Sequence, residues 1–158
     1  MAAAKFRVGL TRDILDSRGE PAFGRAALKI LDDAPDVEWE YLPAIVRELT
    51  AEHAARYDAL YVNMARTPAA VVARPGMRLR VVARHGVGYD TVDVPAMTRA
   101  GVVVTHTPMP MPRPVATIAL TFILALAGKL MLKDRLTRTG RWDERMDNMG
   151  MGLSLIHI

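Results

Sequence analysis

Residues 81–93 read VVARHGVGYDTVD and hold the clearest structural signal in the chain. An apolar, β-branched run typical of a buried strand continues into a Gly-Val-Gly loop at 86–88. Asp93 is suited to cap the helix predicted for VPAMTRA, residues 94–100, and VVVT, residues 102–105, predicts the next strand. Strand, loop, helix and strand in this order indicate a parallel βαβ unit.

The segments before this unit show the same alternation. Short apolar or alternating runs indicate strands, while helical spacing and end signals such as Pro21 and Thr50 indicate helices. Strands are predicted within 6–10, 37–42, 58–64 and 79–83, and helices within 21–34, 50–57 and 67–76. The first of these helices carries, at helical spacing, Ala22, Ala26, Ala27, Ile30 and Leu31. The alternation predicts an α/β domain with a mostly parallel sheet.

The composition of the sequence changes after residue 105, where prolines become frequent. THTPMPMPRP, residues 105–114, contains four prolines and predicts a stiff connector that cannot join a sheet interior. Pro114 can occupy the first turn of one long helix over residues 115–142. The apolar run of that helix, 115–127, is shorter than the roughly 20 residues that span a bilayer, so we expect it to pack against protein and predict no membrane partner. A domain boundary near residue 108 follows.

Composition narrows the class of protein. The 158 residues are 51% hydrophobic and 24% charged, which suits one domain, or one domain and part of another. There is no cysteine, and no apolar segment precedes the first charges, so we expect a cytoplasmic protein. The net charge of +4 comes from scattered basic residues with few aromatic residues between them, so no nucleic-acid partner is predicted. His53 and His106 have no partner at metal-ligand spacing, and no metal is predicted.

The Gly-x-Gly pair invites comparison with a dinucleotide-binding loop, but the rest of that fingerprint is missing. The third glycine of the fingerprint would fall at Thr91, and five residues, 89–93, separate Gly88 from the predicted helix. Two interpretations remain. The glycines serve a tight turn only, or successive backbone N–H groups form a concave anion site suited to a small carboxylate at the carboxyl end of a strand.

Several motifs in order carry a family resemblance. RLRVVARHGVGYDTVDVPAMTRAGVVVTHTP, residues 78–108, resembles the substrate-binding domain of the D-isomer-specific 2-hydroxyacid dehydrogenases, which include D-3-phosphoglycerate dehydrogenase and the glyoxylate/hydroxypyruvate reductases. PVATIALTFILALAGKL, residues 114–130, is similar to the interdomain helix of that family, and RTGRWDERM, residues 138–146, to the Gly-x-Trp stretch after it. The resemblance implies a flavodoxin-like, parallel-sheet substrate domain over 5–108. It also implies a connector, an interdomain helix and the start of a truncated Rossmann domain over 109–152.

The resemblance also implies site residues. The backbone N–H groups of Val87 and Gly88 would hold the substrate carboxylate, and Asn63 would offer a second contact from the loop after the third strand. Arg66 lies slightly later in that loop, where an exposed arginine at a helix start is the alternative. The acid/base histidine of the family comes far later in the chain, so we expect His85 to pack or to face solvent.

The function implied is that of the N-terminal part of an oxidoreductase. Such an enzyme transfers a hydride between NAD or NADP and a small D-2-hydroxy acid or 2-oxo acid, and the full-length protein would be a homodimer. The dinucleotide loop and the catalytic Arg, Glu and His are expected in the missing cofactor domain, so no catalytic residue is assigned here and the chain as written is expected to be inactive.

Two further expectations accompany this interpretation. Residues 153–158, LSLIHI, are compatible codon by codon with a transposon-end adapter used in sequencing libraries, so we expect a non-native tail. The alternative function is a stand-alone α/β module that binds a carboxylate without catalysis, and a purely structural or dimerisation module comes third. An unpaired interdomain helix argues against a stand-alone module.

Overall fold

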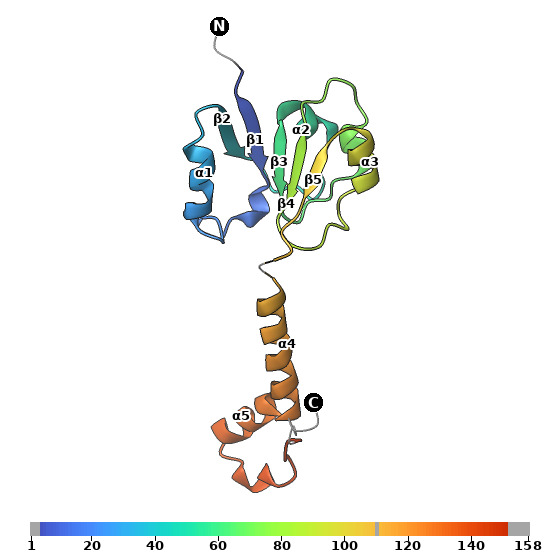
Figure 1. Cartoon of the computed structure of the whole chain (residues 1–158). Helices are drawn as coiled ribbons and strands as arrows, with labels where there is room; N and C mark the ends of the chain where they lie inside the picture. The colour runs from blue at the N-terminus through green and yellow to red at the C-terminus, as the bar shows by residue number, and fades with distance from the viewer. Residues whose placement is uncertain (1–3, 110, 152–158) are drawn as a thin grey trace. The chain divides into compact units, whose positions relative to one another are not determined.

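The computed structural model describes residues 4–109 and 111–151 and divides into two compact units, Met1–Met109 and Pro110–Ile158 (Figure 1). The predicted non-native tail at 153–158 lies outside the described residues. The strands of the first unit are β1 (Phe6–Leu10), β2 (Val37–Tyr41), β3 (Ala59–Val62), β4 (Val81–Arg84) and β5 (Val103–Thr105). Its α-helices are α1 (Lys29–Asp32), α2 (Ala51–Arg56) and α3 (Val94–Arg99), and its 3-10 turns are η1 (Arg12–Ile14), η2 (Arg25–Leu28) and η3 (Ala69–Val72).

The five strands form one parallel sheet in the order β2-β1-β3-β4-β5. This is the flavodoxin-like order, so the predicted fold is confirmed. In the centre of the sheet Leu60 lies opposite both Gly9 and Val82. The order reverses between β1 and β3, and ligands of open α/β sheets bind at the carboxyl ends of the strands beside such a reversal.

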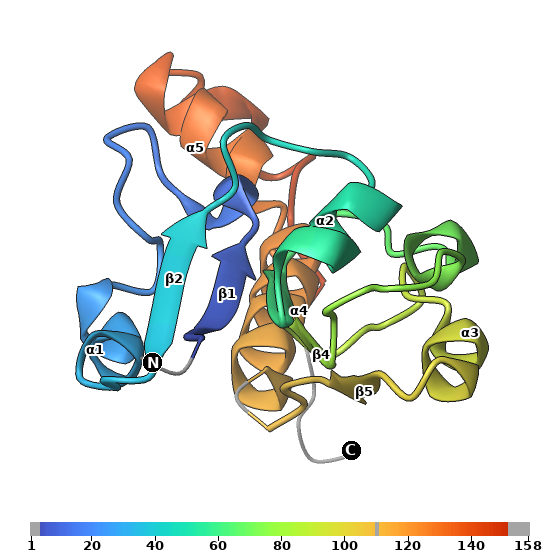
Figure 2. The same ribbon diagram turned by 90° about the horizontal axis from the view of Figure 1, so that it is seen from above.

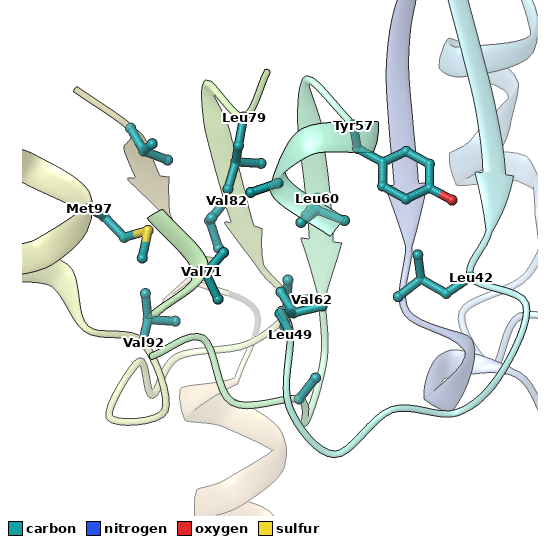
Figure 3. Close-up of a cluster of buried hydrophobic side chains, with 13 residues drawn as sticks. Leu42, Leu49, Tyr57, Leu60, Val62, Val71, Leu79, Val82, Val92 and Met97 are labelled. Atoms are coloured by element: carbon teal, nitrogen blue, oxygen red, sulfur yellow. The ribbon is translucent and has the colours of Figure 1, made fainter. Parts of the chain in front are cut away.

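Alternate residues of the strands build two hydrophobic cores on opposite faces of the sheet. Leu60 and Val62 of β3 belong to the larger core, together with Met97 of α3 (Figure 3). Ala59 and Tyr61 of the same strand pack against the smaller core. The helices that cover the sheet can be followed in Figure 2. Residues of α2, η3 and α3 pack in the larger core, whereas residues of η2 and α1 pack in or against the smaller one.

The helix starts predicted at Thr50 and Asp93 are confirmed. The Thr50 backbone N–H donates to Nδ1 of His53 at 3.0 Å, which closes the first turn of α2. Asp93 accepts a hydrogen bond from the Ala96 N–H at 2.9 Å and caps α3. Both caps use side chains within three residues of the helix start, which is why the local sequence was sufficient to predict them.

The helix predicted over 21–34 is wrong in its extent. Helical structure begins only at Arg25 with η2, because Gly24 takes a positive φ of 80° that a helix cannot contain. Pro21 forms an isolated bridge with Leu15 instead of starting a helix. Leu28 is buried, whereas Ile30, expected on the apolar side, is exposed.

The second unit contains α4 (Pro112–Ala127), α5 (Leu130–Arg138) and the 3-10 turn η4 (Trp142–Arg145). The single long helix predicted over 115–142 is therefore wrong. Lys129 has a left-handed φ of 50° between the two helices, and their axes differ by 57°. The backbone N–H of Met151 donates to the carbonyl of Ala127 at 2.8 Å, so a segment distant in sequence takes a carbonyl that a continuous helix would use.

The proline-rich connector is also shorter than expected. Pro112 and Pro114 belong to the first turn of α4, where a missing backbone N–H leaves no intrahelical bond unmade. Within the described residues, no single helix is long and apolar enough to cross a membrane, and α4 and α5 meet the length and composition requirement only as a bent pair.

Candidate functional site

A cavity of about 270 Å3 lies where β1, β3 and β4 end, beside the reversal of strand order. Its polar lining comes from Asp13, Asn63 and His85, each of which follows the carboxyl end of one of these strands. Phe23 contributes an aromatic wall. The cavity is therefore a small, mixed polar and aromatic space at the edge of the sheet where ligands of this fold bind.

Asn63, one of the predicted site residues, lines this cavity. Its backbone N–H donates to Oγ1 of the buried Thr11 at 3.0 Å, and its Nδ2 donates to the carbonyl of Asp13 at 3.4 Å. The next backbone N–H, that of Met64, donates to Oδ2 of Asp13 at 2.8 Å. These bonds join the loops after β1 and β3, so the Asn63 side chain is held in place at the cavity.

His85 packs between aromatic neighbours, as expected. Its Nδ1 forms a hydrogen bond with the Tyr61 hydroxyl, and its ring centroid lies 5.7 Å from that of Phe23. Burial raises the pKa of the Tyr61 hydroxyl, so this hydroxyl keeps its proton at neutral pH. His85 is thus a half-buried wall residue of the cavity, with one ring nitrogen already engaged.

The Gly-Val-Gly loop is tied to the end of β5. The Gly86 N–H donates to Oγ1 of Thr107 at 2.8 Å, and the Thr107 N–H donates to the Gly86 carbonyl at 2.9 Å. His106 Nδ1–H donates to the Val87 carbonyl at 2.8 Å. Within residues 4–109 and 111–151, the N–H groups of Val87 and Gly88 have no hydrogen-bond acceptor. Both residues are exposed, so the loop presents two donors to solvent at the carboxyl edge.

The two glycines of the loop have different structural roles. Gly86 has a φ of 117°, a conformation that L side chains rarely adopt, and an added Cβ would lie 3.0 Å from Nη1 of Arg84. An added Cβ at Gly88 would make only an ordinary 3.4 Å contact with Oδ2 of Asp90. The turn therefore requires glycine at 86, whereas the fold itself tolerates a side chain at 88.

Arg84, which sequence reasoning did not identify, lies directly against this loop. Its Nε and Nη1 are buried and have no hydrogen-bond partner in the described part of the chain. A half-buried guanidinium with two unpartnered nitrogens raises the local positive potential and favours an anion beside it. The only local signal was an arginine ending an apolar strand. Nη1 of this guanidinium lies close to Gly86 of the loop, a contact that the local sequence does not reveal.

Arg66 does not line the cavity. Its backbone pairs with the loop at 47–49, where Arg66 N–H donates to the Arg47 carbonyl at 2.9 Å and Leu49 N–H donates to the Arg66 carbonyl at 2.8 Å. Its side chain is exposed. Of the four predicted site residues, then, Asn63 lines the cavity and Val87 and Gly88 form the neighbouring loop. Arg66 is anchored through its backbone elsewhere.

The described residues do not fit a dinucleotide. A pyrophosphate needs free N–H groups at a helix start directly after the glycine loop. Here α3 begins six positions after Gly88 and has only six residues, and its first turn is already capped by the Asp93 carboxylate, which would repel a phosphate. The same residues contain no group of three or more His, Cys, Asp or Glu side chains placed to hold a metal ion.

Fold and loop together define a flavodoxin-like α/β domain with a candidate anion site at its carboxyl edge. The family model of the D-isomer specific 2-hydroxyacid dehydrogenase catalytic domain matches residues 18–150. The chain therefore belongs to the D-isomer specific 2-hydroxyacid dehydrogenase family, and the recognition made from the sequence motifs is confirmed.

Individual relatives agree with this assignment. Glyoxylate reductase of Pyrococcus horikoshii is 32% identical over 142 residues, which are 89% of this chain and 40% of that protein. Glyoxylate reductase of Thermococcus onnurineus is 34% identical over 119 residues, 75% of this chain and 36% of that protein. The crystal structure of a D-isomer specific 2-hydroxyacid dehydrogenase from Polaromonas sp. JS6 66 matches with a TM-score of 0.68 at 26% identity, covering 96% of this chain and 46% of that chain. The chain thus spans less than half the length of these relatives.

Proposed function

We propose that this chain is the substrate-binding part of an NAD(P)-dependent enzyme that interconverts a small D-2-hydroxy acid and its 2-oxo acid. The observation that carries the proposal is the pair of N–H groups at Val87 and Gly88, exposed and without acceptors in the described residues, at the ligand-binding edge of a flavodoxin-like sheet. Two adjacent donors match the two oxygens of a carboxylate. The family membership and the names of the relatives support a small 2-oxo acid such as glyoxylate.

The other polar groups of this edge have supporting roles in the proposal. Arg84 supplies positive charge behind the loop, which stabilises a carboxylate on the Val87 and Gly88 donors. Asn63, fixed between the loops after β1 and β3, is the second contact for the substrate. A substrate contact from Arg66 has the least support, because the Arg66 side chain faces solvent.

Hydride transfer rests, in this proposal, on residues outside the chain. The described residues do not fit NAD or NADP, so the cofactor and the Arg, Glu and His groups of the family are assigned to a further domain, together with most of the homodimer contacts. The chain by itself should then bind a carboxylate weakly and should not oxidise NADH in the presence of glyoxylate. Measurable turnover by the purified chain would contradict the assignment of hydride transfer to residues outside it. The absence of cysteine supports a reducing compartment such as the cytoplasm.

The anion site is tested by titrating the 15N-labelled chain with glycolate and following its amide resonances. We expect the Val87 and Gly88 amides to shift most. Val87→Pro deletes one of the two donors and should weaken glycolate binding about tenfold, whereas Val87→Ala, the matched control, keeps the donor and should bind like the native chain. Glycolate shifts that spare the 86–88 loop would contradict the proposed site.

The second candidate is a stand-alone carboxylate-binding module, favoured by the fact that residues 4–109 contain a complete sheet with its own core. A long sequencing read across the source locus, starting upstream of the Gly150 codon, separates the two. The dehydrogenase proposal expects the reading frame to continue through a Gly-x-Gly-x-x-Gly loop to an arginine, a glutamate and a histidine. A stop codon directly after residue 158 would favour the binding module.

A further inference from the structure

Two of the three carbonyl groups of the Gly-Val-Gly loop are held by the segment that follows β5. The Gly86 carbonyl accepts from the Thr107 N–H at 2.9 Å, and the Val87 carbonyl accepts from Nδ1 of His106 at 2.8 Å. The Gly86 N–H is held from the same side by Thr107 Oγ1 at 2.8 Å. Residues 106 and 107 therefore fix the orientation of two successive peptide groups of the loop.

Fixing a carbonyl also fixes the N–H of the same peptide group. A trans peptide is planar, and its C=O and N–H bonds point in opposite directions. No cis peptide occurs in the described residues, so the Val87 carbonyl turned toward His106 directs the Gly88 N–H away from it. In the same way, the Gly86 carbonyl turned toward Thr107 directs the Val87 N–H away from Thr107. These are the two N–H groups without acceptors.

We infer that His106 is a positioning residue for the anion site. Its Nδ1–H holds the Val87 carbonyl and so keeps the Gly88 N–H directed at the ligand. The inference rests on the proposed function, because it assigns His106 a role through the carboxylate that the loop binds. His106 does not touch the substrate in this account. It lowers the cost of binding, because a peptide group that is already oriented loses less freedom when an anion arrives.

Two features define what His106 must be to do this. A carbonyl only accepts, so the neutral imidazole must carry its proton on Nδ1. The ring also packs edge-to-face on Tyr89, with centroids 5.3 Å apart. A packing role and a donor role are therefore both possible for the side chain, and they predict opposite results for two substitutions.

The matched pair of variants is His106→Phe and His106→Asn in the full 158-residue chain. His106→Phe keeps a ring against Tyr89 but loses the donor. His106→Asn loses the ring, but its Nδ2 takes nearly the position of the imidazole Nδ1 and can donate to the Val87 carbonyl. In the glycolate titration we expect His106→Phe to weaken binding about tenfold and His106→Asn to stay within about threefold of the native chain.

The tautomer of the neutral His106 ring gives an independent readout that needs no ligand. Long-range 1H–15N spectra of the native chain should show the neutral His106 as the Nδ1–H tautomer. The Nε2–H tautomer would overturn the inference, because Nδ1 would then have no proton to donate. Equal losses in both variants, or a greater loss in His106→Asn, would overturn it in favour of ring packing.

The outcomes also separate this inference from the proposed function. Native glycolate binding at the Val87 and Gly88 amides that His106→Phe leaves unchanged would overturn only the positioning role. A native chain that shows no glycolate shifts at these amides would overturn both. Thermal melting of each variant shows whether it is folded. If His106→Phe does not fold, the tautomer of His106 in the native chain decides: the Nδ1–H form supports the positioning role, and the Nε2–H form overturns it.

Discussion

The amino edge of the sheet, where the strands begin, and the carboxyl edge, where they end, differ in whether their polar groups have hydrogen-bond partners. At the amino edge, where β1 and β3 begin, Asp58 accepts from the Arg7 N–H at 2.9 Å and from Arg78 Nη2 at 2.7 Å. Within the sheet, Glu40 of β2 accepts from the hydroxyl of the buried Tyr57 at 2.9 Å. At the carboxyl edge, the N–H groups of Val87 and Gly88 have no acceptor in the described residues, and two nitrogens of Arg84 are buried without one.

This difference separates stability from function. At the amino edge Asp58 satisfies a backbone N–H and one nitrogen of the Arg78 guanidinium, which favours the folded state, although Nε of Arg78 is buried without a partner in the described residues. At the carboxyl edge the exposed N–H groups of Val87 and Gly88 face water, whereas the two buried nitrogens of Arg84 lower stability because each lacks a hydrogen bond. In the proposed function, a carboxylate completes the donors at the carboxyl edge. Substitutions at the two edges should therefore change different measurements.

The largest loss of stability is expected at the amino edge, for Asp58→Ala. The substitution leaves the Arg7 N–H and the Arg78 guanidinium without their acceptor, and should lower the free energy of unfolding by about 2–4 kcal/mol. Urea denaturation measures the loss, with Glu38→Ala, at an exposed position of β2, as the control. Glycolate affinity of the folded variant should stay unchanged. A loss of affinity comparable with that of Val87→Pro would show that the two edges are not separate.

A smaller loss is expected for Gly86→Ala at the carboxyl edge. The positive φ of 117° and the approach to Arg84 Nη1 should cost about 1–3 kcal/mol of unfolding free energy. Gly88→Ala, whose Cβ meets only an ordinary contact, should cost less than about 0.5 kcal/mol. Chemical denaturation of both variants makes the comparison. Equal losses would mean that Gly88 has a structural role that its backbone conformation does not reveal.

The smallest effect concerns the pH dependence of stability. The hydrogen bond from the Tyr57 hydroxyl, with Arg56 and Arg7, lowers the pKa of Glu40 below its ordinary value of 4.5, although burial opposes the shift. The unfolded chain then binds more protons than the folded one, so this contribution is present above pH 4.5 and is lost as the pH falls through the folded-state pKa. Glu40→Gln should make unfolding free energy fall less steeply below pH 4.5. Denaturation of the native chain and of Glu40→Gln from pH 3 to pH 7 tests this. Identical slopes of unfolding free energy against pH would mean that Glu40 does not contribute to the pH dependence. Some slope should remain, because the hydrogen bonds of Asp58 outweigh its burial and lower its pKa too.

Local patterns predicted the elements whose causes are local. β1, β2, β3, β4 and β5 follow from short β-branched or alternating runs, and the caps at Thr50 and Asp93 follow from side chains within one turn of the helix. The helix predicted over 21–34 failed at the positive φ of Gly24, whereas the helix predicted over 115–142 failed where a distant segment also contributes. The Met151 N–H donates a hydrogen bond to the Ala127 carbonyl, 24 positions earlier in the chain, and the hydrophobic periodicity of α4 and α5 does not predict this contact.

The candidate site divides in the same way. The loop at 86–88, its position after a strand and its incomplete dinucleotide fingerprint are properties of consecutive residues, so the sequence alone indicated the candidate anion site and argued against a phosphate loop. The burial of Arg84, the bond from His106 to the Val87 carbonyl 19 residues away and the cavity shared by Asn63 and His85 were decided by the tertiary structure. They depend on which strand ends meet at one edge of the sheet, and that order is set by long-range packing of the two faces rather than by any local preference of the chain.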